Sequence, residues 1–152
     1  MRNFFQEIKQ DFSKLKEFIE YYNNEYEEAV KETFISGNVV EQTKKLPQQM
    51  TYRFTQLQEI EAVLRHVEIL RDAVVGEKWK EYTEKKAKLL TAVEKKNYIA
   101  QEADVILYEK AVNEVSFIRN KFISLTKGFD SKNFALSNII KLKVAGVDDW
   151  SV

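Results

Sequence analysis

The 152-residue sequence contains no cysteine, one proline, one histidine and four glycines. The absence of cysteine excludes disulfides and thiolate metal sites. Few glycines and prolines mean few helix breakers, which favours long helices over a sheet protein. No apolar run approaches the roughly 18 residues needed to cross a bilayer, and the first residues, MRNFFQEIKQDF, lack the apolar core of a secretion signal. We therefore expect a cytoplasmic protein with no membrane-spanning segment.

The groups used in catalysis and cofactor binding are also scarce. His66 is the only histidine, and the sequence has no glycine-rich turn that would present a nucleophilic serine or cradle a phosphate group. Glu61 lies five residues before His66, which does not match the Glu-x-x-His spacing of a helical di-metal site. We interpret the acidic run within residues 25–32 as a solvated helix face. The sequence therefore predicts no enzyme activity, no metal site and no cofactor.

Charge is plentiful and segregated along the chain. Charged residues make up 32% of the sequence, above the usual quarter, and the 24 basic and 24 acidic groups cancel. Residues 1–36 carry a net charge of −3, residues 77–96 of +3, residues 98–116 of −3 and residues 117–145 of +5. A polarised chain of this kind can bind a polyanion through its basic regions. The same regions can instead dock on the acidic ones within an oligomer.

Apolar residues repeat at helical spacing in the first half of the chain. In residues 4–35, two neighbouring rows with a seven-residue repeat form one stripe, which predicts a helix with coiled-coil packing that ends at Gly37-Asn38. Pro47 suits the first turn of a helix, and the heptad rows that follow it predict a second helix over residues 47–75.

The second half begins with an uninterrupted run. Between Gly76 and Gly128 lie 51 residues without glycine or proline. They predict a helix over residues 77–127, about 77 Å long at about 1.5 Å per residue, with a kink or a loop allowed near residues 87–97. Such a helix is longer than the diameter of a compact domain of this size, so the molecule is expected to be elongated.

A short C-terminal helix is expected to follow. Gly128 is predicted to end the long helix, and a last helix over residues 131–145 is predicted before an acidic tail over residues 146–152. This last helix is apolar around most of its circumference, so we expect other copies of the chain to bury it. The candidate oligomerisation residues are Ile118, Phe122, Leu125, Phe134, Leu136, Ile139 and Ile140. The predicted fold class is all-α, a single elongated domain over residues 1–152 with coiled-coil-like packing and a C-terminal oligomerisation helix.

The segment KWKEYTEKKAK, residues 78–88, interleaves cations with aromatic rings. Single-stranded nucleic acid is held by this combination, because cations follow the phosphates and rings stack on the bases. The candidate nucleic-acid-binding residues are Lys78, Lys80, Tyr82, Lys85, Lys86 and Lys88. In the alternative interpretation, the rings belong to the apolar stripe of the helix and the lysines form a solvated face.

Three stretches resemble the UvsY family of phage recombination mediators. KKLPQQMTYRF at residues 44–54 resembles the entry to the family's first long helix, and VVGEKWKEYTEKK at residues 74–86 resembles its basic–aromatic segment. Residues 88–146 are similar in pattern to the family's C-terminal half, including the closing Ala-Gly. The resemblance covers about two thirds of the chain.

The resemblance implies a function as well as a fold. Members of the family are ring-forming, non-enzymatic oligomers that bind single-stranded DNA, remodel the single-strand-binding protein and load a RecA-like recombinase. On this resemblance, Lys78 and Lys80 contact phosphate, Tyr82 stacks or supports a base, and the segment from Ile118 to Val144 forms the oligomer core. A phage-encoded protein of this kind would act in the host cytoplasm.

Two other hypotheses remain open from the sequence. The aromatic stripe within residues 4–35 and the neutral total charge also suit a helical scaffold or adaptor that acts only through protein–protein contacts. A curved helical dimer that lies on anionic lipid would use the same lysines. Binding to labelled oligonucleotides and to liposomes separates the three.

Overall fold

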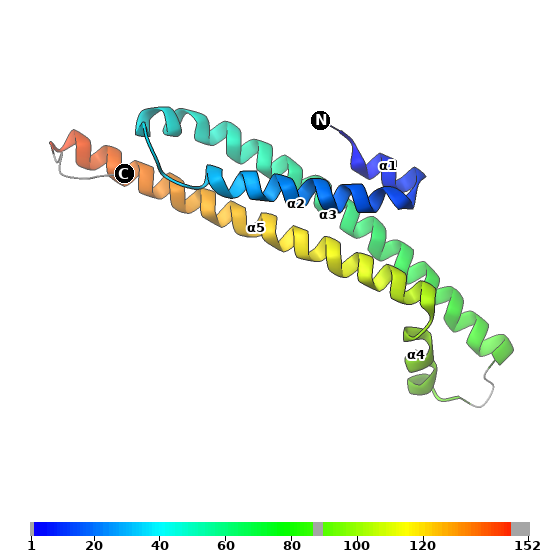
Figure 1. The fold of residues 1–152 in the computed structure, drawn as a ribbon. Helices are drawn as coiled ribbons and strands as arrows, with labels where there is room; N and C mark the ends of the chain where they lie inside the picture. Colours follow the sequence, from blue (N-terminus) through cyan, green and yellow to red (C-terminus); the bar gives the residue numbers. More distant parts are fainter. Residues whose placement is uncertain (1, 87–89, 147–152) are drawn as a thin grey trace.

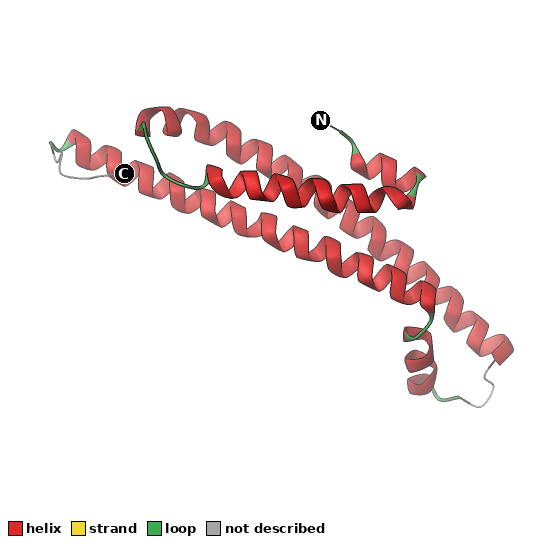
Figure 2. Cartoon of the chain, viewed as in Figure 1, coloured by secondary structure: helices red, strands yellow, loops and turns green. Residues whose placement is uncertain are grey.

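The structure is a computed structural model that describes residues 2–86 and 90–146. Every regular element in these residues is helical, which confirms the predicted all-α fold class (Figure 2). The elements are α1 (Phe4–Gln10), a 3₁₀ turn η1 (Phe12–Lys14), α2 (Leu15–Glu32), α3 (Val39–Glu81), a π-helical turn η2 (Tyr82–Lys86), α4 (Ala92–Ala100) and α5 (Ala103–Val144).

Two helices of nearly equal length form the body of the molecule. α3 has 43 residues and α5 has 42, and they run antiparallel and pack side by side (Figure 1). At about 1.5 Å per residue each helix is about 64 Å long. α2 lies along the middle of this pair, and α1 folds back to contact α3. α4 lies at the end where α3 finishes and α5 starts, so the molecule is an elongated helical bundle.

The core lies where α2 meets α3 and α5. Tyr22 of α2 is at its centre, with its ring 4.9 Å from that of Phe18 and 5.6 Å from that of Phe122 on α5. The Tyr22 hydroxyl donates a 2.6 Å hydrogen bond to Glu59 Oε1 of α3, so its polar end is satisfied. The other large, fully buried apolar side chains are Phe4, Ile8, Ile60, Val63, Val67, Ile118, Phe129 and Leu136.

The prediction of one helix over residues 4–35 is wrong. α1 ends at Gln10, and Asp11 is extended, with φ −146° and ψ 103°. The Asp11 side chain accepts a 3.0 Å hydrogen bond from the backbone N–H of Ser13, and this local bond competes with continuation of the helix. The chain reverses here, yet Ile8 and Leu15 of the predicted heptad row both stay buried.

The prediction that a helix starts at Pro47 and ends at residue 75 is also wrong. α3 starts at Val39, because the Asn38 side chain caps it by accepting a 3.2 Å hydrogen bond from the backbone N–H of Glu41. Pro47 lies within α3 on its exposed side, where water can reach the carbonyl group that proline leaves unpaired. The helix then passes through Gly76 and continues to Glu81.

Residues 77–127 do not form the single long helix that was predicted. The chain leaves α3 at Glu81, passes through η2, and forms α4 before it turns into α5. Thr91 and Glu94 form a capping box, in which each side chain accepts a hydrogen bond from the other residue's backbone N–H, and this starts α4. The sequence allowed a kink or a loop at residues 87–97, but residues 92–97 belong to α4, and the turn between α4 and α5 lies beyond that range, at Gln101 and Glu102.

A separate C-terminal helix over residues 131–145 is absent, because α5 runs unbroken through Gly128 to Val144. A Cβ atom on Gly128 would lie 3.3 Å from Thr33 Cγ2, so the glycine allows close approach of the chain after α2. Burial of Leu125 and Phe129 on either side offsets the cost of about 1 kcal/mol of a helical glycine. Of the predicted tail, residues 147–152 lie outside the described part of the chain.

Candidate nucleic-acid interface

The predicted basic–aromatic segment lies at the end of the bundle where α3 finishes. Lys78 is in the last turn of α3, and its ammonium group is surrounded by carboxylates. Its Nζ atom lies 3.5 Å from Asp104 Oδ2, 3.7 Å from Glu81 Oε2 and 3.9 Å from Glu102 Oε2. Glu102 and Asp104 stand at the N-terminus of α5, where the helix dipole stabilises negative charge. Lys78 therefore connects the end of α3 to the start of α5.

The electrostatic environment keeps Lys78 charged. Burial acts to lower its pKa, but the charges of Asp104, Glu102 and Glu81 outweigh that effect, and the pKa is raised. A phosphate group that binds Lys78 must therefore compete with these carboxylates.

Tyr82 is held by the same carboxylate that contacts Lys78. Its hydroxyl donates a 2.7 Å hydrogen bond to Glu102 Oε1, so Glu102 contacts both predicted binding residues. Tyr82 is the first residue of η2, and π-helical turns are frequent at functional sites. The structure thus brings Lys78 and Tyr82 together through Glu102, a partner that the sequence did not predict.

The other candidates at this end differ in their surroundings. Lys80 is exposed, whereas Trp79 beside it is half-buried. The backbone of Lys85 and Lys86 belongs to η2, but their side chains, like the whole of Lys88, lie outside the described part of the structure.

α4 adds two exposed groups that the sequence analysis missed, Lys96 and Tyr98. Tyr98 is 51% exposed, which leaves much of its ring open to solvent. The spacing of Thr91 and Glu94, Ser/Thr-x-x-Glu, is a signal in the sequence for the start of this helix. Lys80, Lys96 and Tyr98 lie on elements at the same end of the bundle, which therefore offers exposed cations and an exposed aromatic ring.

The candidate oligomerisation residues do not form one surface. Four of them, Ile118, Phe122, Leu125 and Leu136, are buried in the core of a single chain. Ile139 and Ile140 are half-buried against that core, and Phe134 is 71% exposed. Oligomerisation stays a prediction, and the four buried residues are not accessible to another copy in this fold.

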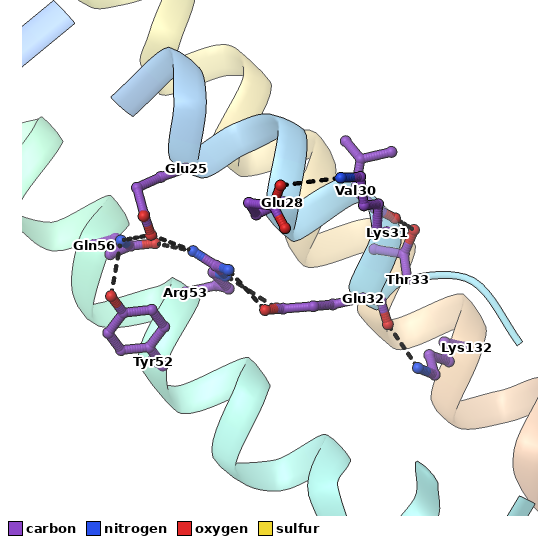
Figure 3. A network of polar contacts seen from close by, with 10 residues as sticks. All are labelled: Glu25, Glu28, Val30, Lys31, Glu32, Thr33, Tyr52, Arg53, Gln56 and Lys132. Carbon is purple, nitrogen blue, oxygen red and sulfur yellow. Dashed lines mark hydrogen bonds and ion pairs between the residues drawn. The ribbon is translucent and has the colours of Figure 1, made fainter. Parts of the chain in front are cut away.

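A buried polar network ties α2 to α3 (Figure 3). The Arg53 guanidinium donates hydrogen bonds to Glu32 at 2.7 and 3.0 Å and to Glu25 at 2.7 Å, and a further bond of 2.9 Å to Gln56 Oε1. Burial acts to lower the pKa of Arg53, but its bonds to Glu32 and Glu25 outweigh that effect and raise it. Because Arg53 is matched by partners from its own chain, we assign this cluster to the stability of the bundle.

Lys132 of α5 extends this network to the third helix. Its Nζ atom donates a 2.6 Å hydrogen bond to the backbone carbonyl of Glu32 at the end of α2, and burial lowers its pKa (Figure 3). A lysine in this place satisfies a carbonyl group that the end of a helix leaves without a partner. The network thus fixes α2 against both long helices.

The chain matches no family model, and comparisons with curated proteins and with solved structures also found no match. Within the described residues, no helix combines the length and the apolar character needed to span a membrane. The same residues contain no group of three or more histidine, cysteine or acidic side chains placed to hold a metal ion.

Proposed function

We propose that the protein is a non-catalytic, homo-oligomeric mediator of recombination that binds single-stranded DNA and helps to load a RecA-like recombinase. The observation that carries this proposal is the distribution of charge along the bundle. The described parts of residues 77–96, a segment with a net charge of +3, lie at one end, and residues 117–145, with +5, extend to the other. Of the acidic regions, residues 98–116 lie between them, whereas α2 of residues 1–36 lies alongside residues 117–145, where Tyr22 packs on Phe122 and Lys132 bonds the carbonyl of Glu32. An elongated molecule with separated basic regions suits a long polyanion.

The recombination part of the proposal rests on the resemblance to the UvsY family. That resemblance supplies the recombinase and the single-strand-binding protein as partners, and the charge distribution supports only the binding of a polyanion. A second candidate function is a scaffold that contacts proteins alone. It is favoured by the position of Lys78 and Tyr82, whose polar groups contact acidic residues of the same chain.

The first test is the binding of a fluorescent single-stranded oligonucleotide at several salt concentrations. The logarithm of the binding constant should fall linearly with the logarithm of the salt concentration. The double variant Lys80→Ala/Lys96→Ala should reduce this slope by about 1.4, because each lost contact with single-stranded phosphate removes about 0.7. The matched control is Lys16→Ala/Lys110→Ala, which removes two exposed lysines from the acidic middle of the bundle. Absence of binding at low salt would exclude the proposed function and favour the scaffold.

A second prediction concerns Glu102, which contacts both Lys78 and Tyr82. Glu102→Gln removes one negative charge from Lys78 and keeps an oxygen that can accept the hydrogen bond of Tyr82. If Lys78 binds phosphate, the affinity for the oligonucleotide should rise about two- to fivefold, as expected for release of a weak ion pair. Glu109→Gln is the control, because it makes the same change in charge on α5 away from Lys78. Glu109 is an exposed carboxylate whose Oε1 atom lies 3.6 Å from Arg71 Nε. Equal affinities of the two variants would show that Lys78 does not contact the strand.

A further inference from the structure

α5 has an exposed row of side chains that faces away from the rest of the bundle. Its buried side chains follow one another in steps of four and three, namely Ile118, Phe122, Leu125, Phe129, Lys132 and Leu136. The residue two positions after each of these is rotated by about 200° around the helix axis, since each residue turns the helix by about 100°. These residues, together with the next in the series, form the outer row: Asn120, Ser124, Lys127, Ser131, Phe134, Asn138 and Lys141. All seven are exposed.

The chemistry of the outer row differs from that of a helix-packing surface. Steps of four and three are the spacing of a coiled-coil seam, which is normally filled with leucine, isoleucine or valine. The outer row contains no aliphatic side chain and no carboxylate. It offers two hydroxyl groups, two amides, two ammonium groups and a single phenyl ring. A second helix would bury almost no apolar area against it, so the row does not suit a second copy of the chain as a packing partner.

The same groups match a single nucleic-acid strand. Ammonium, hydroxyl and amide groups are the usual donors to phosphate oxygens, and an exposed phenyl ring stacks on a base. Phe134 is 71% exposed and lies seven residues from Lys127 on one side and from Lys141 on the other. The two lysines are therefore about 21 Å apart along the helix, the length of about six stacked nucleotides at about 3.4 Å each.

The end of the bundle that holds the last part of the outer row carries further exposed cations. Lys143 is exposed near the end of α5, and Lys44 and Lys45 are exposed near the start of α3, which lies at the same end of the bundle (Figure 1). Within residues 127–144 four lysines stand against Asp130, and within residues 39–46 Lys44 and Lys45 stand against Glu41, so cations outnumber carboxylates in these two segments. A helix that binds an anionic membrane inserts several apolar side chains from one face. The outer row has only Phe134, which favours a nucleic-acid strand over a lipid surface.

We propose that the outer row of α5 binds single-stranded nucleic acid, with Lys127 and Lys141 on phosphates, the hydroxyl and amide groups beside them as further donors, and Phe134 stacked on a base. This inference rests on the proposed function and adds a second surface for its strand, on α5, to the predicted basic–aromatic segment at the other end of the bundle. It also gives Phe134 a role that does not require an oligomer.

The test uses two pairs of variants in the full chain. Lys127→Ala/Lys141→Ala should reduce the salt slope of oligonucleotide binding by about 1.4, and Lys16→Ala/Lys110→Ala, with the same change in charge, should leave it unchanged. Phe134→Ala should weaken binding about tenfold at every salt concentration without changing the slope. Phe117→Ala, at a 62% exposed phenylalanine of α5 outside the row, is its control and should bind like the wild type.

The outcomes separate this inference from the proposed function. If the wild type binds the oligonucleotide and the outer-row variants bind like their controls, the inference is wrong and the proposed function stands. If the wild type does not bind at all, both are wrong. Sedimentation with anionic phosphatidylserine vesicles completes the test. Vesicle binding that depends on Lys127, Phe134 and Lys141, without binding of the oligonucleotide, would assign the row to lipid and overturn the inference.

Discussion

Replacement of Phe122 by alanine should lower the free energy of unfolding by about 3–5 kcal/mol, the usual cost of removing a phenyl ring from a well-packed core. Phe122 is 1% exposed, and its ring lies 5.6 Å from that of Tyr22 and 6.2 Å from that of Tyr26. These contacts join α5 to α2, and the long helices around them cannot move inward far enough to fill the space. Most of the cavity should therefore persist, which places the loss in this range.

The measurement is urea denaturation followed by circular dichroism at two protein concentrations. Because Phe122 packs within one chain, the decrease in the free energy of unfolding caused by Phe122→Ala should be the same at both protein concentrations. Phe134→Ala on the same helix is the control, and it should change the free energy of unfolding by no more than about 0.5 kcal/mol. A large loss for Phe134→Ala that grows on dilution would instead place Phe134 in a subunit interface, as the sequence analysis predicted.

The fold class was predictable because it depends on periodicity. In the two heptad rows of the second predicted helix, Leu57, Leu64, Ile60 and Val67 are buried as their spacing required, whereas the last members, Arg71 and Val74, are half-buried. Helix boundaries were less predictable, because Pro47 and Gly128 act as breakers only when tertiary packing does not compensate for them. Gly128 allows the close approach of Thr33, a residue 95 positions earlier in the chain. No local pattern reports that contact.

The candidate site was predicted only in part, for a similar reason. The charge of Lys78 and the aromatic ring of Tyr82 are evident in the sequence, but their contact with Glu102 exists because α5 returns antiparallel to α3. That return depends on the break between the two helices. The outer row of α5 was readable from spacing alone, yet Phe134 was grouped with Leu136 and Ile139 as one apolar helix. Only the buried row of α5 shows that Phe134 lies on the opposite side from Leu136.

The buried network around Arg53 leads to the second large effect on stability. Arg53→Ala should lower the free energy of unfolding by about 3 kcal/mol, because it leaves the carboxylates of Glu25 and Glu32 without the guanidinium group that bonds them both. Arg53 is only 6% exposed, whereas the side chains of both glutamates are about a quarter exposed. Water can therefore solvate the two unpaired carboxylates in the variant. The expected decrease in the free energy of unfolding lies at the lower end of the range for broken buried ion pairs. Thermal and urea denaturation would measure it.

Lys31→Ala provides the matched control on the same face of the bundle. Lys31 pairs with Glu28 at 3.0 Å, but both side chains are about two-thirds exposed, so its loss should cost no more than about 0.5 kcal/mol. The double variant Arg53→Ala/Glu32→Ala should lose less than the sum of the two single variants, with a coupling of about 1–3 kcal/mol. If Arg53→Ala and Lys31→Ala have equal effects, the network does not hold α2 on α3, and the core around Tyr22 alone must do so.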